Sequence, residues 1–325
     1  MKHILLSISI VFMVVLPVHA DAELPELSVF IDEMVTEHGF NRDELEAVFD
    51  DVEVKDSILK AISRPAEKSK PWYDYRNIFI TESRINGGVA FWQEHKEALA
   101  HAEATYGVPA EIIVAILGVE TRYGGNVGGY RVIDALSTLA FRYPPRSPFF
   151  RSELEHFLIL TREEQMSQLE PVGSYAGAMG LGQFMPSSYR AYAVDFDGDG
   201  RRDIWTNHTD AIGSIANYLK VHGWVPGQSI VHRTEVNNEL SEKMLDNALK
   251  PSYSREELAV AGFSLAQLPA GNDVLSIVTL TQPEGEEYWL GRQNFYAITR
   301  YNHSRMYAMA VTQLAQAIRQ QFGEL

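Results

Sequence analysis

An uninterrupted apolar run, IIVAILGV at residues 112–119, constrains the fold of this chain more than any other feature. As a helix this run has no polar face, and a helix that is apolar all round must be surrounded by other parts of the protein. Pro109 can occupy its first position, and Gly124 and Gly125 can end it. We therefore expect a buried helix that begins at Pro109 and ends just before the glycines.

Glu120 follows the run directly, so it lies in the last turn of the expected helix. Apolar surroundings and the partial negative charge of a helix C-terminus both disfavour an ionised carboxylate. A carboxyl group that stays protonated near neutral pH can act as a general acid, most often on a glycosidic oxygen. The alternative is a structural acid that pairs with Arg122. The glycines and Tyr123 favour a ligand site, because they let backbone and an aromatic ring approach a ligand closely.

The overall charge and the absence of cysteine exclude several classes of function. The 325 residues carry 28 basic and 43 acidic side chains, a net charge of −15, which repels nucleic acid. No cysteine is present, so disulfides, thiolate zinc sites and a lipid-modified N-terminal cysteine are excluded. The glycines of GAMGLG (177–182) do not follow the order of the dinucleotide-binding fingerprint, and no organic cofactor is expected.

The first twenty residues predict an exported protein. Lys2 precedes an apolar stretch that is too short to span a bilayer comfortably, and Val18, His19 and Ala20 suit signal peptidase. We expect a signal peptide that is removed after Ala20, which leaves a soluble periplasmic or secreted chain with no stable membrane span. A segment that stays as a membrane anchor is the alternative.

Helix caps and strand-like runs indicate a mainly α, α+β protein. Ser28 can cap a first helix, and Asn41 with Glu44 makes another capping pair. Ser254 with Glu257 makes a third. Strand-like runs occupy 229–235, 274–281 and 294–301, and the last of these is expected to pair with 286–290.

These patterns divide the chain into five expected segments, with no repeat or linker between them. They are a signal peptide (1–20), an N-terminal helical lobe (21–104), a catalytic core with an acidic loop (105–224), a small α/β insertion (225–291), and a C-terminal strand and helix that complete the core (292–325).

The stretch DFDGDGRRDIW at 195–205 resembles the start of an EF-hand calcium loop. Acids stand at loop positions 1, 3, 5 and 9, and Gly200 stands at position 6, where a sharp turn is needed. Position 12 is Thr206 in place of the usual glutamate, and Asp210 is the next acid that could close a longer loop. Unneutralised carboxylates in one turn would repel each other, which favours a structural calcium ion over a metal-free acidic turn. The expected ligands are Asp195, Asp197, Asp199, the Arg201 carbonyl and Asp210.

Three motifs together resemble the lytic murein transglycosylase B family of peptidoglycan-cleaving enzymes: GVETRYGG (118–125), GSYAGAMGLGQFMPSSY (173–189) and NFYAITRYNHSRMYAMA (294–310). The likeness covers nearly the whole chain after the leader. It implies a lysozyme-like helical core with extra lobes, and cleavage of the β-1,4 bond between N-acetylmuramic acid and N-acetylglucosamine. It also implies that the muramoyl C6 hydroxyl, rather than water, attacks C1 and leaves a 1,6-anhydro sugar.

The resemblance assigns Glu120 to the single catalytic acid of the family, which protonates the leaving oxygen and then deprotonates the C6 hydroxyl. Ordinary glycosidases use two carboxylates, and Asp134 is more simply explained as a structural acid at a helix start. The cleft positions implied by the family are Tyr75, Arg146, Ser174, Gln183, Phe184, Tyr218, Tyr301, Asn302 and Tyr307. Asn302 can also cap the last helix. One departure is Pro145, because the family commonly has a second arginine beside Arg146.

Two other functions stay open on the sequence. A hydrolytic muramidase would use Glu120 with a base that the nearby motifs do not identify. An inactive calcium-dependent peptidoglycan-binding protein would keep the fold without turnover. In each case the expected partners are peptidoglycan glycan strands, and the protein could join cell-wall enzyme complexes.

Overall fold

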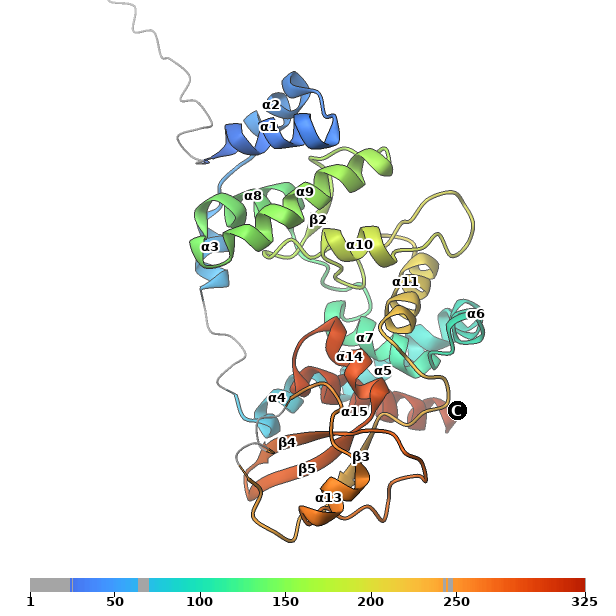
Figure 1. Ribbon diagram of the computed structural model, residues 1–325. Coiled ribbons are helices and arrows are strands. Elements are labelled where there is room, and N and C mark those ends of the chain that lie inside the picture. The colour runs from blue at the N-terminus through green and yellow to red at the C-terminus, as the bar shows by residue number, and fades with distance from the viewer. Residues whose placement is uncertain (1–23, 25, 64–69, 242–243, 245–247, 325) are drawn as a thin grey trace, which may run out of the picture.

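The helix α7 (Ala110–Thr121) is the expected buried helix, and only its residues Glu111, Val119 and Glu120 are not fully buried. In a computed structural model, which describes residues 24, 26–63, 70–241, 244 and 248–324, four other helices enclose it (Figure 1). These helices are α5 (Glu82–Glu94), α6 (Lys96–Tyr106), α11 (His208–Val221) and α15 (Arg305–Gly323). Full burial of an Ile, Leu or Val side chain contributes about 1.5–3 kcal/mol, so the apolar run strongly stabilises the centre of the protein.

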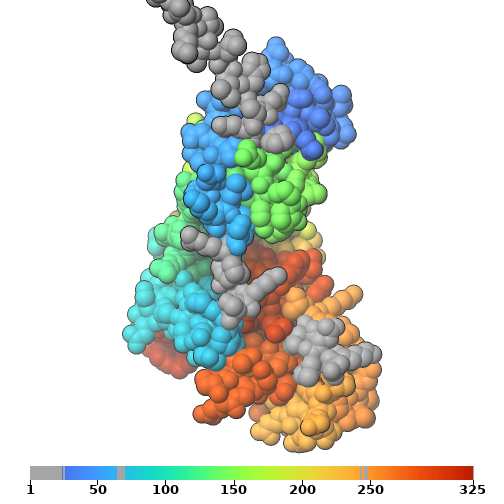
Figure 2. Space-filling model, turned by 90° about the vertical axis from the view of Figure 1, so that its left-hand side faces the viewer, coloured from blue at the N-terminus to red at the C-terminus, as the bar shows by residue number. Residues whose placement is uncertain are grey.

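A second group of helices lies beyond this centre, and the N-terminal helices pack on it (Figure 1). α8 packs against both α3 and α9, and ion pairs from His38 and Glu33 join α1 to α9. Figure 2 shows the N-terminal helices in blue at one end of an elongated molecule. The elements of this part are α1 (Leu27–His38), α2 (Arg42–Asp50), α3 (Asp56–Ile62), β1 (Tyr130–Arg131), α8 (Val132–Arg142), the 3-10 helix η2 (Pro144–Arg146), α9 (Ser147–Glu163), β2 (Val172–Gly173) and α10 (Pro186–Tyr192).

The stretch expected as one N-terminal lobe, residues 21–104, is divided between these two groups of helices. α3 packs on α8, and α1 is joined to α9, whereas α5 and α6 pack against α7. The intervening α4 (Trp72–Phe79) packs against α15. An amphipathic helix buries its apolar face against whichever surface the tertiary structure offers, and nearness in sequence does not select that surface. The expected single lobe therefore does not describe the packing.

Residues 225–291 contain a small antiparallel sheet and the helix α13, at the opposite end of the molecule from α1 (Figure 1). The strands β3 (Val231–Thr234), β4 (Ser276–Gln282) and β5 (Gly285–Gly291) lie in the order β3-β5-β4. One face covers a separate apolar cluster around Leu258, Leu275 and Leu290, all of them buried. The expected strands at 229–235 and 274–281 are confirmed in type, with shorter bounds.

The segment 294–301, expected to be a strand, is the helix α14 (Gln293–Tyr301). β5 is already paired with β3 on one edge and β4 on the other, so no edge remains for another strand. Phe295 and Ile298, spaced as neighbours on one helix face, are fully buried. The Asn294 side chain bonds the backbone of Val225 through both its oxygen and its nitrogen, at 2.7 and 2.9 Å, which anchors the start of the helix.

Two of the expected helix caps are confirmed and two are wrong. The Asn41 side chain accepts from the Glu44 N–H, and Ser254 with Glu257 forms a complete capping box for α13 (Arg255–Val260). Ser28 instead lies inside α1, which begins at Leu27.

The last helix, α15, is capped by Ser304, whose hydroxyl accepts from the Tyr307 N–H, and not by Asn302. At the central helix, Pro109 lies just before α7, and Arg122 in the left-handed conformation ends it ahead of Gly124.

Among the residues that the structure describes, no individual helix has the length and hydropathy needed to cross a bilayer. α6 and α7 reach that threshold only when taken together, and they are bent by 114° relative to each other. The predicted signal peptide, residues 1–20, lies outside the described residues.

Candidate active site

Glu120 and Tyr307 meet where the end of α7 lies against the start of α15. The Tyr307 hydroxyl donates a hydrogen bond of 2.5 Å to Glu120 Oε1. Tyr307 is 2% exposed, whereas Glu120 is half-buried. Burial raises the pKa of Tyr307 well above its ordinary value, and the negative charge of Glu120 raises it further. The phenol therefore keeps its proton and holds one carboxylate oxygen of Glu120 in place.

Tyr301 and Tyr75 extend this contact into a cluster of aromatic rings. The Tyr301 ring is parallel to that of Tyr307, with centroids 6.5 Å apart, and its hydroxyl donates to the Gly182 carbonyl at 2.6 Å. Burial raises the pKa of Tyr301, and the charge of Glu120 raises it further. Tyr75 is buried, and its phenol contributes to the raised pKa of Tyr307. The structure thus brings Tyr307 and Tyr301 together beside Glu120, and Tyr75 lies near enough to Tyr307 to affect its pKa.

Phe184 and Tyr218 lie behind this cluster. They are 3% and 7% exposed, and the Phe184 ring centroid is 5.8 Å from those of both Tyr218 and Tyr301. The Tyr218 hydroxyl donates to the Arg300 carbonyl at 2.5 Å. The structure places both residues as buried packing groups that support the tyrosine cluster.

Gln183 belongs to a segment that is attached to the last turn of α7. Thr121, the residue after Glu120, donates from its hydroxyl to the Leu181 carbonyl at 2.9 Å. Gln183 has a φ of 53°, and its amide nitrogen donates to the carbonyls of Gly180 at 2.9 Å and Val127 at 3.2 Å. Thr121 was not among the site residues predicted from the sequence. This hydrogen bond holds the glycine-dense segment beside the turn that carries Glu120.

Ser174 begins the same segment, and its hydroxyl serves the local turn. The oxygen accepts from the N–H groups of Ala176 at 3.3 Å and Ala178 at 3.1 Å. The side chain is half-buried. This arrangement keeps the hydroxyl in a defined position at the edge of the segment.

Arg146 and Asn302 occupy different surroundings from the tyrosine cluster. The Arg146 guanidinium lies over the rings of Phe149 and Phe150, 4.4 and 5.1 Å from their centroids. Asn302 is exposed at the C-terminal end of α14. The structure therefore gives Arg146 a cation–π contact at the start of α9.

Tyr123, which the sequence favoured as a ligand contact, is a packing residue in the structure. Its hydroxyl donates to the Arg84 carbonyl at 2.7 Å, and burial raises its pKa. Its ring lies against Gly87 and Gly118, where an added Cβ would come within 2.9 and 2.5 Å of it. The glycines of α5 and α7 thus make room for this tyrosine.

Three of the four predicted loop acids converge. Asp195, Asp197 and Asp210 each place a carboxylate oxygen within 4.8 Å of the others. Asp210 is fully buried, and its pKa is raised by that burial and by the charge of Asp197. Carboxylate oxygens grouped in this way suit a hard cation such as calcium, which takes six to eight oxygen ligands.

Asp199 does not join this group, although the sequence predicted it as a ligand. Its carboxylate accepts from the Arg201 N–H at 2.9 Å and so caps its own exposed turn. Asn207, which the sequence analysis missed, donates to Asp197 at 2.7 Å and caps α11 through its side-chain oxygen. An asparagine just before an apolar helix is a capping signal, and it could have identified this residue.

The mainly helical fold is of the lysozyme-like type, and it places the half-buried Glu120 at the end of a buried helix, where a buried tyrosine bonds it. The family described as Transglycosylase SLT domain matches residues 23–316. The chain belongs to this family, which covers nearly its whole length.

Relatives of known name and structure are lytic transglycosylases as well. The chain is 47% identical over 307 residues to membrane-bound lytic murein transglycosylase B of Escherichia coli K12, covering 91% of this chain and 83% of that protein. SltB1 of Pseudomonas aeruginosa has a TM-score of 0.88 and 53% identity, over 92% of this chain and 98% of that one. Escherichia coli lytic transglycosylase Slt35, solved in complex with calcium, has a TM-score of 0.84 and 46% identity, over 93% and 95%.

One relative has been solved with a ligand that derives from peptidoglycan. SltB3 of Pseudomonas aeruginosa, which is 31% identical with a TM-score of 0.77 over 89% of this chain and 77% of that one, has been solved in complex with NAG-anhNAM-pentapeptide. Relatives of this chain therefore bind both calcium and peptidoglycan fragments.

Proposed function

We propose that this protein is a lytic transglycosylase that cleaves the β-1,4 bond between N-acetylmuramic acid and N-acetylglucosamine in peptidoglycan without water. Family membership and the 47% identity to a lytic murein transglycosylase support the reaction class. The observation that carries the assignment to Glu120 is the 2.5 Å hydrogen bond from Tyr307, because it orients a carboxyl at the end of a buried helix.

In the proposed reaction Glu120 acts twice. As the acid, it gives its proton to the glycosidic oxygen, and the bond from that oxygen to the muramoyl C1 breaks with its electron pair leaving on the oxygen. The muramoyl C6 hydroxyl oxygen then attacks C1, and its proton passes to the Glu120 carboxylate. The acid is regenerated, a 1,6-anhydro ring is closed, and no water is consumed. Tyr307 stabilises the carboxylate between the two steps.

A single carboxyl is enough for this sequence of steps, and Asp134 is not placed to be a second one. Asp134 is 2% exposed in the first turn of α8. It accepts two hydrogen bonds of 2.8 Å from Arg131 and one of 3.0 Å from the Glu53 N–H. These contacts support the expected role of Asp134 as a structural acid. The muramoyl N-acetyl group can stabilise positive charge at C1 in place of a second carboxylate.

We also propose that Gln183, Ser174 and the tyrosine cluster contact the sugars. Gln183 is half-buried, and its segment is attached to the turn that carries Glu120. The complex of a relative with NAG-anhNAM-pentapeptide supports an anhydro sugar as a ligand of this fold.

The product mass separates this function from a hydrolytic muramidase. Digestion of purified sacculi should release fragments that end in anhydromuramic acid, each one water lighter than the hydrolytic product. Fragments with reducing ends throughout would show hydrolysis. Binding to sacculi with no release of soluble fragments would instead support an inactive binding protein.

Removal of the Tyr307 hydroxyl should slow the reaction while the fold is kept. A hydrogen bond to a charged group contributes about 1.5–3 kcal/mol, so Tyr307→Phe should lower kcat roughly 10- to 100-fold, with a smaller change in KM. Steady-state rates on soluble glycan fragments would measure both constants. Tyr288→Phe, in the separate sheet, is the matched control and should keep its rate. A kcat equal to wild type in Tyr307→Phe would contradict the proposed orienting role.

We propose that Asp195, Asp197 and Asp210 hold a structural calcium ion, with the Arg201 carbonyl as a further ligand. The calcium complex of Slt35 supports this proposal. The loop also places the Ile204 carbonyl 2.8 Å from the Leu181 N–H, so it supports the segment that carries Gln183 without touching Glu120.

Removal of calcium should therefore lower the melting temperature. A ligand that binds only the folded state stabilises it by about 2.7 kcal/mol at one hundred times its dissociation constant. Calorimetry with added calcium and with a chelator would measure the difference. Asp210→Asn should abolish it, because the buried ligand loses its charge. Identical melting curves of wild type with calcium and with chelator would rule the site out.

We propose that the protein acts in the bacterial cell envelope on glycan strands. The similarity to a protein named membrane-bound lytic murein transglycosylase B supports this location. The predicted cleavage after Ala20 can be checked by N-terminal sequencing of the exported chain, which should begin at Asp21. A chain that still carries residue 1 would show that the segment is an anchor.

A further inference from the structure

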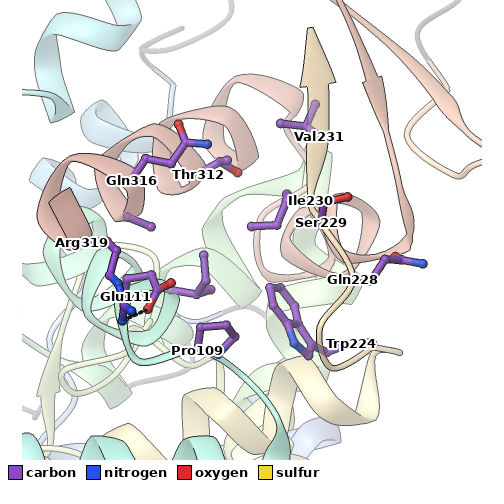
Figure 3. Close-up of a pocket in the computed structure, with 12 residues that line it drawn as sticks. Pro109, Glu111, Trp224, Gln228, Ser229, Ile230, Val231, Thr312, Gln316 and Arg319 are labelled. Atoms are coloured by element: carbon purple, nitrogen blue, oxygen red, sulfur yellow. Dashed lines mark ion pairs between the residues drawn. The ribbon is translucent and has the colours of Figure 1, made fainter. Parts of the chain in front are cut away.

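A pocket lies at the other end of the α7–α15 pair from Glu120 and Tyr307. Its volume is about 310 Å³, and it is bounded by the start of α7, the end of α15 and the segment 224–231 that leads into β3 (Figure 3). Nine residues separate Glu111 in this pocket from Glu120, which is about 13 Å along a helix axis. The pocket is therefore separate from the proposed reaction centre, and it is large enough for a small organic ligand.

One side of the pocket carries an ion pair in which one carboxylate oxygen lacks a hydrogen bond. Glu111 Oε2 lies 3.8 Å from Arg319 Nη1, within the range of an ion pair but beyond that of a hydrogen bond. Within the described part of the chain, this buried oxygen has no hydrogen-bond partner. Buried polar groups are normally hydrogen-bonded, and an unsatisfied one costs about 1–3 kcal/mol. Burial raises the pKa of Glu111, whereas a hydrogen bond from its own backbone and, to a smaller extent, the positive charge of Arg319 oppose that effect.

The opposite side of the pocket is mainly apolar, and the polar groups of Trp224 and Ser229 on it are already hydrogen-bonded. Figure 3 shows Glu111 and Arg319 together, across the pocket from Trp224 and Ile230. The Trp224 indole N–H donates to the Gly107 carbonyl at 2.9 Å, so the ring offers only apolar surface to the pocket. The Ser229 hydroxyl already bonds His232 at 2.6 Å and Arg292 at 2.8 Å. Among the described residues that line the pocket, the buried side-chain oxygen without a hydrogen-bond partner is therefore Glu111 Oε2, and the guanidinium of Arg319 beside it is 62% exposed.

We propose that this pocket binds a small zwitterion, an ammonium and a carboxylate carried on a short apolar body. The ammonium would donate to Glu111, the carboxylate would accept from Arg319, and the body would cover the apolar wall. A ligand with a single charge would satisfy one partner and compete with the other, whereas a zwitterion keeps the charge balance and completes both. Such chemistry is found in a free α-amino acid and in a short peptide whose two ends are both free.

Leucine and two analogues test the charge requirement on the wild-type protein. Isoamylamine lacks the carboxylate of leucine, and 4-methylpentanoate lacks its amine, while both keep the apolar body. In a titration followed by the NMR signal of the Trp224 indole N–H, leucine should bind at least about tenfold more tightly than either analogue, which is a difference of about 1.4 kcal/mol. Dialanine is the peptide arm of the test. Tighter binding of dialanine than of leucine would support the proposal and identify a short peptide as the ligand.

Variants test the residues, and their outcome is independent of glycan cleavage. Glu111→Gln and Arg319→Gln should each weaken binding of the preferred zwitterion about tenfold or more. Arg42→Gln removes a surface guanidinium from another ion pair and should leave the affinity unchanged. Affinities for the analogues equal to that of the zwitterion, wild-type affinity in both pocket variants, or no shift of the Trp224 signal up to the solubility limit of leucine and dialanine would each overturn the proposal.

Discussion

Glu120→Gln should reduce the release of soluble muropeptides from sacculi by about 100- to 10,000-fold, the range that a positioned general acid or base contributes. Glutamine keeps the shape of the side chain and can still accept the hydrogen bond from Tyr307, which is 2.5 Å long in wild type. It has no proton to give to the glycosidic oxygen and no carboxylate to receive one from the C6 hydroxyl. The loss should fall on kcat, because the same group is needed in both proton transfers.

Folding and binding separate this result from a simple loss of structure. Glu120→Gln should bind sacculi as wild type does and should melt at a similar temperature. Glu97→Gln, an exposed position on α6, is the matched control and should retain full activity. Full activity of Glu120→Gln would show that the acid lies elsewhere. Loss of binding together with turnover would point to a structural role for Glu120.

Gly180→Ala should cost about 2 kcal/mol of unfolding free energy or more, and should also lower activity. Gly180 has a φ of +68°, and an added Cβ would lie 2.5 Å from the Ile204 carbonyl oxygen. That carbonyl accepts from the Leu181 N–H at 2.8 Å, and this contact joins the segment of Gln183 to the acidic loop. A methyl group would push the two segments apart. Urea unfolding would measure the stability, and muropeptide release the activity.

Gly39→Ala separates the two causes of this effect. Gly39 has nearly the same φ, +67°, but nothing lies within 4 Å of an added Cβ. It should therefore lose only about 1–2 kcal/mol, the cost of a left-handed conformation for alanine, with activity unchanged. Equal losses in the two variants would show that backbone conformation, rather than the contact with Ile204, explains Gly180.

Features decided by neighbouring residues were predicted well from the sequence. The apolar run 112–119 leaves no solvent-facing side for its helix, so burial of α7 and the place of Glu120 in its last turn follow directly. The capping box of Ser254 is decided within four residues. The spacing of Asp195 and Asp197 identified the acidic loop, and Asp210 joins them. The nearness of Tyr307 to Glu120 was expected only from the family resemblance, because nothing local connects them.

The predictions from the sequence failed where contacts between segments far apart in the chain decide the structure. The stretch 294–301 has enough aromatic and branched residues for a strand, yet β5 is paired on both edges, and burial of Phe295 and Ile298 favours a helix. Tyr123 was expected to contact a ligand, but its hydroxyl donates to the Arg84 carbonyl, because the glycines of α5 and α7 leave room for its ring.

The sequence by itself determined which helix is buried, where its acid stands and where the acidic loop lies, because those properties depend on side chains within a few turns of each other. Only the tertiary structure decided that Glu120 meets Tyr307 at one end of α7 and α15 and that Glu111 meets Arg319 at the other. Both contacts join residues far apart in the chain. The free energy that forms them comes from burial of the apolar faces between the two helices, which no local pattern records.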